Sequence, residues 1–305
     1  MNHIPVLLKE SLENLITSAD GNYFEGTVGF GGHTKSILER LSPSAKLIGT
    51  DKDFYAFNFS TEKFTKDSRV TIYNTSFLNI QTVARLESVL KFDGVFLDLG
   101  VSSYQLDTPD SGFTYRENTK FDLRMNKKDG KPAHYFINEM SEKELADIMF
   151  KYGEEKASRK IAKAFVEERT SSPITMTNQI NNIVAGLMGE RFLNKSLSRI
   201  YQAFRILVNN ELDELKEFLN KCIDLLNPGG KLVIISFHSL EDRIVKEFFK
   251  YESIDCICPT SSPICICEKE STLKIITRKP IIAGSDELMN NPRARSAKLR
   301  VAQKI

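Results

Sequence analysis

Apolar residues gather in short runs along the chain, and three of these runs end in an acidic residue. The runs lie at residues 23–25, 46–51, 70–74, 94–98 and 231–237. Amphipathic patterns with a helical period stand between several of them, for example at residues 35–41. Alternating strands and helices are typical of a parallel sheet that is covered by helices. We therefore expect an α/β fold whose ligand site lies at the carboxyl ends of the strands.

Helical patterns fill the long interval between the fourth and fifth expected strands. Residues 141–150 open with a Ser-x-x-Glu capping box, and residues 154–169 interleave Lys, Arg and Glu. Pro173 then breaks the chain before another helical pattern at residues 177–188. We predict an all-helical subdomain at residues 105–210, inserted into an α/β domain made of residues 1–104 and 211–305. Its place after the ligand edge favours substrate recognition over a purely structural bundle.

Residues 112–125 of this insertion mix aromatic residues with arginines and have no strong helical period. Phe113, Tyr115 and Arg116 stand near its start, and Arg124 near its end. Such a segment is suited to stacking on and clamping a nucleic-acid base that has been turned out of its helix. An ordinary surface loop is the competing interpretation.

The overall charge does not indicate a nucleic-acid partner, because 42 basic residues face 40 acidic ones and the net charge is +2. Local basic patches must then carry any RNA contact. One candidate is a C-terminal stretch without acidic residues, for which a solvated tail is the alternative; it contains Arg293, Arg295, Lys298, Arg300 and Lys304. No apolar run approaches the roughly 20 residues needed to span a bilayer, so we expect a cytoplasmic protein without a membrane partner.

Four of the five cysteines form a palindromic pattern, Cys-x-Cys-Pro followed by Pro-x-Cys-x-Cys. They are Cys256, Cys258, Cys265 and Cys267. Disulfides are disfavoured in a reducing cytosol. Four thiolates suit zinc, although a single residue within each pair departs from the usual spacing of two to four. A metal site and a loop of reduced thiols both stay open, and we expect no metal in the catalytic site.

A glycine-rich segment follows the first expected strand and leads into a helix. It reads Gly29-Phe30-Gly31-Gly32-His33-Thr34, and its glycines allow a ligand to approach the backbone closely. Asp51 ends the second strand 22 residues after Gly29 and is suited to binding the ribose hydroxyls of an adenosine group, unless it caps the next helix. Phe77 follows the third strand, where it would lie against the adenine or belong to the core.

The fourth strand ends at Asp98, whose carboxylate is expected at the same edge, facing the amino group of a cofactor or the substrate. Ser102, Ser103 and Gln105 come next and supply hydrogen-bond donors and acceptors without a strong nucleophile. The absence of a cysteine there disfavours the cysteine-adduct route of carbon methylation. His238 follows the fifth strand, where it either contacts the substrate and accepts a proton or fixes the turn into the next helix.

Seven segments in order resemble the 16S ribosomal RNA cytosine-N4 methyltransferases, the RsmH family formerly called MraW. The matching segments are His3-Ile4-Pro5-Val6-Leu7-Leu8, Gly29-Phe30-Gly31-Gly32-His33-Thr34, Asp98-Leu99-Gly100-Val101-Ser102-Ser103, Phe121-Asp122-Leu123-Arg124-Met125, Gln202-Ala203-Phe204-Arg205-Ile206, Ser236-Phe237-His238-Ser239-Leu240-Glu241-Asp242-Arg243 and Asn291-Pro292-Arg293-Ala294-Arg295-Ser296. Three positions depart from the family pattern: Glu25 replaces an Asp, Lys52 an Arg and Tyr104 a Pro.

The resemblance implies a class I, Rossmann-like fold that depends on S-adenosylmethionine, with an inserted helical domain. It implies methylation of N4 of a cytidine in the decoding centre, at the P site, of 16S ribosomal RNA. The expected partner is this RNA within the small ribosomal subunit, and a homodimer stays open. The implied cofactor contacts are Gly31, Gly32, His33, Asp51, Phe77, Asp98 and Gln105. The candidates for orienting the amino group are Asp98, Ser102, Ser103 and His238.

Two alternatives come from other classes of protein. A nicotinamide-dependent oxidoreductase is supported by the glycine turn and Asp51 alone, and calorimetry with each cofactor separates it from a methyltransferase. A non-catalytic ribosome-assembly factor would use the helical insertion and the basic C-terminal stretch to bind RNA. Binding to small subunits without methyl transfer would favour that second alternative.

Overall fold

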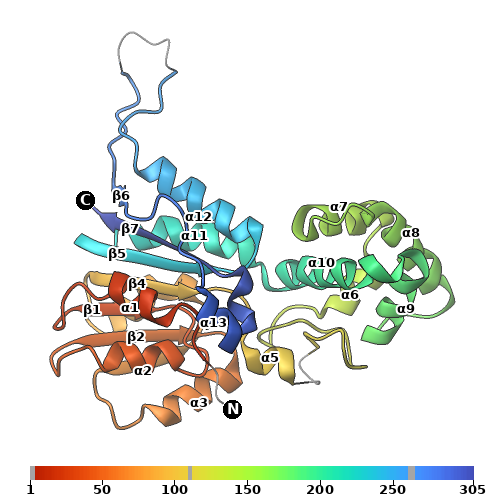
Figure 1. Cartoon of the computed structure of the whole chain (residues 1–305), viewed down its shortest axis with the longest axis horizontal. Helices are drawn as coiled ribbons and strands as arrows, with labels where there is room; N and C mark the ends of the chain where they lie inside the picture. Colours follow the sequence, from red (N-terminus) through yellow and green to blue (C-terminus); the bar gives the residue numbers. More distant parts are fainter. Residues whose placement is uncertain (1–3, 109–111, 260–264) are drawn as a thin grey trace. The chain divides into compact units, whose positions relative to one another are not determined.

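Seven strands form one sheet in the order β3-β2-β1-β4-β5-β7-β6 (Figure 1). The computed structural model describes residues 4–108, 112–259 and 265–305, apart from the side chain of Ser103. The strands are β1 (Asn22–Glu25), β2 (Lys46–Asp51), β3 (Val70–Asn74), β4 (Phe92–Asp98), β5 (Leu226–Ser236), β6 (Leu273–Ile275) and β7 (Lys298–Lys304). Strands β1 to β5 run parallel, and β7 runs antiparallel to both β5 and β6. The predicted α/β fold is confirmed.

Side chains of the central strands alternate between two hydrophobic cores, one on each face of the sheet. Tyr23 and Phe96 point into one core, whereas Phe24, Val95 and Leu97 point into the other. All five are buried. Both faces of the sheet are therefore covered, as expected for a parallel sheet.

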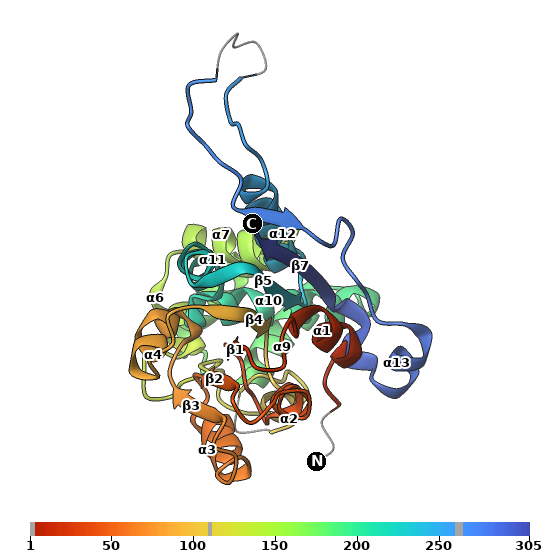
Figure 2. The same cartoon turned by 90° about the vertical axis from the view of Figure 1, so that its left-hand side faces the viewer.

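Helices of the same unit supply the covering layers. Leu12 and Leu15 of α1 (Leu8–Leu15) and Ile37 of α2 (Gly32–Leu38) join the core of Tyr23, while Phe218 of α11 (Glu211–Ile223) and Phe249 of α12 (Ser239–Glu252) join the core of Phe24. Figure 2 shows these layers from the side. The remaining elements are α3 (Phe54–Lys63), η1 (Phe77–Asn79), α4 (Ile80–Leu86), α13 (Ser285–Asn290) and η3 (Pro292–Ser296).

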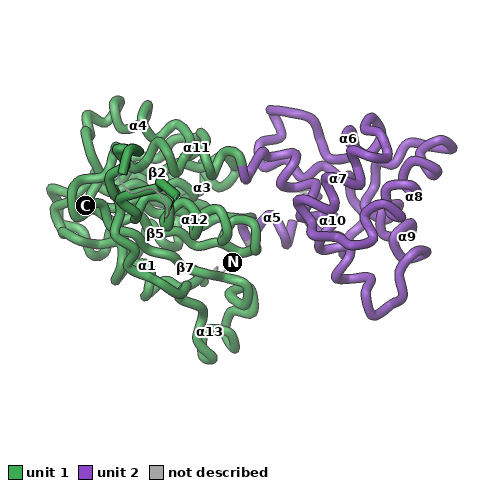
Figure 3. Tube along the Cα trace, turned by 90° about the horizontal axis from the view of Figure 1, so that it is seen from above, with its two compact units in different colours: residues 1–100, 213–305 green, residues 101–212 purple. Residues whose placement is uncertain are grey.

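The chain divides into two compact units, residues 1–100 with 213–305 and residues 101–212 (Figure 3). The helices of the second unit are α5 (Ser103–Asp107), α6 (Ala133–Glu139), α7 (Glu142–Gly153), α8 (Ser158–Ser171), α9 (Thr177–Leu187) and α10 (Glu190–Asn209). It has its own core, with Phe165 and Phe204 fully buried. The expected capping box forms, because Glu144 donates its backbone N–H to Ser141 and its carboxylate accepts the N–H of Ser141.

The interpretation of the C-terminal basic stretch as a tail is wrong. Residues 298–304 form β7, which lies between β5 and β6 in the sheet. Arg300 is buried, and its Nε lies 2.6 Å from Oδ1 of Asp242, while Lys298 contacts Oδ2 of the same carboxylate at 3.2 Å. These contacts hold the pKa of Asp242 below its usual value even though burial acts in the opposite direction. Both cations serve the fold rather than an RNA surface.

Across the described ranges, no helix is both long and apolar enough to cross a membrane.

Candidate cofactor and substrate site

The turn after β1 leaves open space beside Gly29 but not beside Gly31 or Gly32. Gly29 and Gly31 have φ angles of +54° and +69°, in the left-handed region that favours glycine. A Cβ on Gly31 would lie 2.4 Å from Cε2 of Phe64, whereas a Cβ on Gly29 would have no neighbour within 4 Å. Lys63 of α3 stabilises the turn, because its Nζ donates hydrogen bonds to the carbonyl oxygens of Phe30 at 2.9 Å and Gly31 at 3.2 Å. The backbone at Gly29 is thus accessible to a ligand.

Asp51 ends β2 beside this turn. Its Oδ2 accepts the backbone N–H of Gly29 at 2.7 Å, and its Oδ1 accepts that of Asp53 at 2.8 Å. The helix cap that the sequence left open belongs to Asp53, which accepts the N–H groups of Tyr55 and Ala56 at the start of α3. Burial raises the pKa of Asp51 to about 6, against the effect of the two backbone hydrogen bonds. Each carboxylate oxygen keeps a lone pair for a further hydroxyl group.

Glu25 is the functional candidate that the sequence analysis undervalued. It is buried at the end of β1, where Oε2 accepts the hydroxyl of Thr34 at 2.7 Å and Oε1 has no hydrogen-bond partner. Burial raises its pKa to about 8, and the negative charges of Asp98 and Asp51 add to this effect. The available signal was an acidic residue that ends an apolar strand directly before the glycines.

Asp98 ends β4 at the same edge of the sheet, because β1, β2 and β4 are parallel neighbours. Its backbone N–H donates to the Thr27 hydroxyl at 2.8 Å, and its Oδ1 is buried without a hydrogen-bond partner. Burial raises its pKa to about 7, with a further contribution from the charge of Glu241. The structure therefore brings three acidic side chains, Glu25, Asp51 and Asp98, to one edge.

His33 lies beneath the edge rather than on its surface. The side chain is buried, its Nε2 is 3.1 Å from the carbonyl oxygen of Val6, and its ring centroid is 4.7 Å from that of Phe96. Its Nδ1 lies 3.7 Å from Oδ2 of Asp98. The imidazole is therefore close to the Asp98 carboxyl group, at a distance longer than a hydrogen bond.

Phe77 begins η1 after β3 and is partly buried. Its ring packs edge-on against that of Phe218, with centroids 5.1 Å apart. This contact belongs to the hydrophobic core, and a contact with adenine stays a prediction.

His238 is the N-cap residue of α12. Its Nδ1 accepts the backbone N–H of Glu241 at 3.4 Å, and the Glu241 carboxylate in return accepts the N–H groups of Phe237 and His238. The accepting Nδ1 places the proton of the neutral ring on Nε2, which lies 3.2 Å from Oε1 of Glu241. The imidazole thus holds the strand-to-helix turn, as the second interpretation of this residue expects.

Ser102 and Gln105 form a capping box at the start of α5, in the second unit. The Ser102 hydroxyl accepts the N–H of Gln105 at 3.2 Å, and Oε1 of Gln105 accepts the N–H of Ser102 at 2.9 Å. The side chain of Ser103 lies outside the described part of the structure. The box fixes the backbone at the start of the second unit.

The prediction that the aromatic residues of segment 112–125 stack on a base is wrong for Phe113 and Phe121, which are buried. Phe121 packs edge-on against Tyr201 and Phe204, with centroids 5.0 and 5.5 Å apart, and Tyr115 packs against the same Tyr201. Phe121 and Tyr115 belong to the core of the helical unit, because Tyr201 and Phe204 of α10 pack against their rings. Arg124 is not available as a clamp either, since its Nε lies 2.7 Å from Oδ1 of Asp122.

A doubly wound sheet that ends in a glycine turn and three acidic residues, of which Glu25 is buried and Asp51 and Asp98 are partly buried, defines a class of enzymes that bind a nucleoside-containing cofactor. Comparison with known proteins narrows this class. The sequence pattern described as the MraW methylase family matches residues 1–305. The chain belongs to the MraW methylase family.

Named relatives resemble the chain along almost its whole length. Ribosomal RNA small subunit methyltransferase H of Caldicellulosiruptor saccharolyticus is 46% identical over 304 residues, covering 99% of both chains. The protein of the same name from Fusobacterium nucleatum is 46% identical over 304 residues, covering 99% of this chain and 97% of its own. A crystal structure of a putative rRNA methylase from Clostridium thermocellum has a TM-score of 0.47 at 12% identity, covering 99% of this chain and 100% of its own.

Membership of this family settles the class of reaction. The chain is a methyltransferase that uses S-adenosylmethionine. Its mainly parallel sheet, covered by helices on both faces, agrees with the Rossmann-like fold that the resemblance implies. The expected enzyme class and cofactor are confirmed over the nicotinamide-dependent and non-catalytic alternatives.

Proposed function

We propose that this enzyme methylates N4 of a cytidine in the decoding centre, at the P site, of 16S ribosomal RNA in the cytoplasmic small ribosomal subunit. The observation that carries the proposal is the family match over residues 1–305, together with relatives that are named for the small-subunit RNA. The chemistry at the sheet edge supports it, because the edge offers hydrogen-bond acceptors for an amino group.

We assign the methyl donor to the carboxyl edge of β1, β2 and β4. The proposed contacts are Gly31, Gly32, His33, Asp51, Phe77, Asp98 and Gln105, with Glu25 added from the structure. Two features fit a cationic, adenosine-bearing group: the open space beside Gly29, and the buried oxygens of Glu25 and Asp98 that have no hydrogen-bond partner. An unpartnered buried carboxyl group is costly to ionise, and a ligand cation relieves that cost.

The bound cofactor supplies an electrophilic methyl group on its sulfonium. The chain must orient a poor nucleophile, because the lone pair of the exocyclic nitrogen of cytosine is delocalised into the ring. A carboxylate that accepts an amino proton favours the pyramidal nitrogen and holds it in line. Asp98 is the proposed acceptor, with Ser102, Ser103 and His238 as further candidates. Asp98 is the stronger acceptor when it is ionised, and its pKa of about 7 places that change near neutral pH.

We propose that the helical unit recognises the RNA substrate, as expected for residues 105–210. Exposed cations follow one another along a segment of this unit that the sequence analysis did not single out as basic; they are Arg116, Lys120, Lys127, Lys128 and Lys131. Phosphate contacts of this kind position RNA without reading its sequence. We therefore assign the RNA phosphate contacts to these cations instead of to the C-terminal basic stretch.

Nucleoside mass spectrometry tests the reaction. Small-subunit RNA from cells with and without the protein is digested and compared, and cells without it should lack one N4-methyl mark on cytosine. Purified enzyme and labelled S-adenosylmethionine should restore the mark on subunits from those cells. A missing methyl group on a ribose or on carbon-5 would contradict the proposal.

A further inference from the structure

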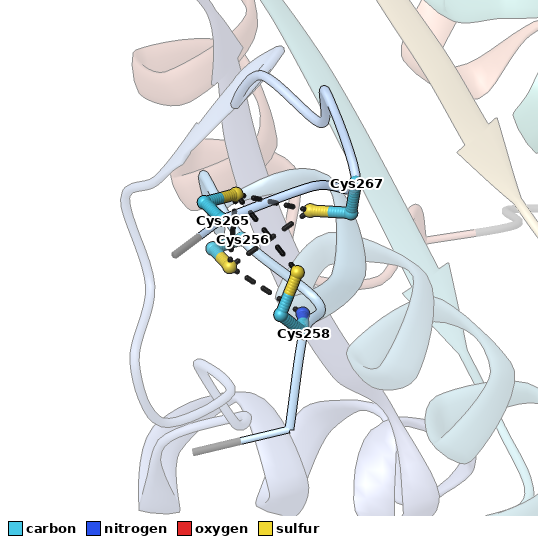
Figure 4. A group of neighbouring side chains, drawn as sticks. All are labelled: Cys256, Cys258, Cys265 and Cys267. Atoms are coloured by element: carbon cyan, nitrogen blue, oxygen red, sulfur yellow. Dashed lines mark hydrogen bonds between the residues drawn. The ribbon is translucent and has the colours of Figure 1, made fainter. Parts of the chain in front are cut away.

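Four cysteines meet in the segment between α12 and β6. Its two arms run side by side beyond the end of α12 in both views of the chain (Figures 1 and 2). Near the sheet the arms are joined by backbone and side-chain hydrogen bonds, from Thr272 to Glu252 and from Ser271 to Asp255. Farther out, the cross-arm hydrogen bonds among the described residues all involve a cysteine sulfur. Figure 4 shows the four thiols turned toward one another.

The distances between the sulfur atoms match one coordination geometry. The Sγ of Cys265 lies 3.4 Å from that of Cys256, 3.9 Å from that of Cys258 and 3.6 Å from that of Cys267, and Cys256 and Cys267 are 3.8 Å apart. A tetrahedral zinc site with Zn–S bonds near 2.3 Å has edges of about 3.8 Å. A disulfide needs sulfurs about 2.05 Å apart. The cluster therefore has the size of a tetrahedron of thiolates around one ion.

Backbone amides support negative charge on two of these sulfurs. The N–H of Ile257 donates to Sγ of Cys267 at 3.3 Å, and the N–H of Ile266 donates to Sγ of Cys258 at 3.4 Å. Each arm thus offers the amide between its own two cysteines to a sulfur of the other arm. This reciprocal arrangement explains the single-residue spacing within each Cys-x-Cys pair, because the intervening residue supplies the donor.

The segment around the cluster has little hydrophobic core of its own. The side chains between the paired cysteines face solvent, with Ile257 49% and Ile266 83% exposed. Short segments that bury little apolar surface are commonly held by metal ions or disulfides.

We propose that Cys256, Cys258, Cys265 and Cys267 bind one Zn²⁺ ion that holds the two arms together. Binding replaces the thiol protons, which pass to solvent. Four protein ligands close the coordination shell, so the site is structural and takes no part in methyl transfer. Zinc is favoured over harder cations because all four ligands are sulfur, and over copper(II) and nickel(II) because the sulfurs form a tetrahedron.

Metal analysis of the full-length protein tests the proposal. The chain is purified under reducing conditions, incubated with zinc, freed of excess metal by gel filtration and measured by plasma mass spectrometry. We expect one zinc per chain, and a loss of at least tenfold in bound zinc for the C258S/C267S double variant. C222A is the matched control, because Cys222 is buried in α11 and its thiol donates to the carbonyl oxygen of Leu219.

Cobalt substitution of the unaltered chain keeps the test valid should the double variant fail to fold. Cobalt(II) in a four-thiolate site gives intense visible bands and sulfur-to-cobalt charge-transfer bands, which added zinc should abolish. Less than a tenth of an equivalent of zinc in folded, reduced protein would overturn the proposal, as would stoichiometric iron in its place. Four reduced thiols that react with a thiol reagent equally fast with and without zinc would overturn it as well.

Discussion

At the scale of single residues, the carboxyl edge of the sheet brings together three acidic side chains that are buried or partly buried. The pKa values of Glu25, Asp98 and Asp51 are raised to about 8, 7 and 6, and burial is the largest cause for each. The hydrogen bonds to Glu25 and Asp51 come from a hydroxyl and from backbone amides, which carry no full charge. A cationic ligand at this edge would lower all three pKa values.

Substitution of Asp98 tests its proposed contact with the substrate amino group. Asp98→Asn keeps the shape of the side chain and one acceptor oxygen but removes the negative charge, and loss of one group that stabilises developing charge typically costs about 100-fold in kcat. We expect this loss in methyl transfer to small subunits, with a smaller rise in KM for S-adenosylmethionine. The control is Asp224→Asn, an exposed carboxyl after α11. A kcat within threefold of the unaltered enzyme would contradict the role of Asp98.

The raised pKa values also predict how stability depends on pH. Between the ordinary carboxyl pKa near 4 and the folded-state values of 6 to 8, the folded chain binds more protons than the unfolded chain. Stability of the cofactor-free protein should therefore fall as pH rises from 5 to 8, by up to about 1.4 kcal/mol per pH unit for each titrating group.

Urea unfolding at pH 5, 6.5 and 8 measures this dependence. Glu25→Gln should flatten the upper part of the curve, because it removes the group with the highest folded-state pKa of the three. Saturating S-adenosylmethionine should flatten it as well. A cofactor-free protein that gains stability over this range, or a variant with an unchanged slope, would be inconsistent with the buried carboxyl groups described.

At the scale of elements, two glycines of the turn after β1 have different requirements. Both have a left-handed backbone, but Gly31 is packed against Phe64 whereas Gly29 faces open space. In both Gly29→Ala and Gly31→Ala, the alanine must adopt a left-handed backbone conformation, which costs about 1 to 2 kcal/mol of stability. Gly31→Ala adds a contact with Phe64 and should lose roughly 2 to 4 kcal/mol in all. Gly29→Ala places a methyl group in the open space that we assign to the cofactor. This variant should therefore bind S-adenosylmethionine at least tenfold more weakly.

Thermal unfolding and calorimetry on the two alanine variants distinguish these effects. The expected result is that Gly31→Ala unfolds at the lower temperature, while Gly29→Ala shows the larger loss of affinity relative to its loss of stability. Equal cofactor affinity in Gly29→Ala and the unaltered chain would place the ligand away from this turn.

The five parallel strands could be predicted because their apolar residues are contiguous and each run is bounded by turn residues. Strand β7 could not, because Arg300 interrupts its pattern and is neutralised by Asp242, which lies 58 positions away. The prediction that segment 112–125 stacks on a base was wrong for a similar reason, because Phe121 packs against Tyr201 and Phe204, which are far away in sequence. Local sequence shows which side chains are present, whereas distant partners decide whether they face the core or a ligand.

The buried Arg300 pair gives a prediction for β7. Arg300→Met leaves the Asp242 carboxylate with Lys298 alone and should destabilise the chain by about 2 to 4 kcal/mol, because a buried charge loses its main partner. Chemical denaturation measures the change. Arg295→Met, at an exposed position of η3, should stay within about 0.5 kcal/mol. The double variant D242L/R300M should recover at least half of the loss, and failure to do so would argue against the ion pair as the cause.

At the scale of the whole molecule, the two compact units divide the work that we propose. Residues 101–212 are continuous in sequence and have their own core, whereas the sheet unit is assembled from residues 1–100 and 213–305. The expected boundaries, 105 and 210, lie a few residues inside those of the helical unit, because sequence patterns mark helices rather than the contacts that close a core. Glu25, Asp51 and Asp98 all belong to the sheet unit, while the exposed cations proposed for RNA belong to the other.

Replacing residues 101–212 with a short glycine-serine linker should therefore separate cofactor binding from substrate recognition. We expect the sheet unit to bind S-adenosylmethionine within about tenfold of the intact chain, since only the Gln105 contact is removed, and to lose methyl transfer to small subunits. The residue 101–212 fragment should fold by itself, because it carries its own buried core. Calorimetry, circular dichroism and a labelled-methyl assay measure the three outcomes. A sheet unit that still methylates the small subunit at the full rate would show that the helical unit does not select the substrate.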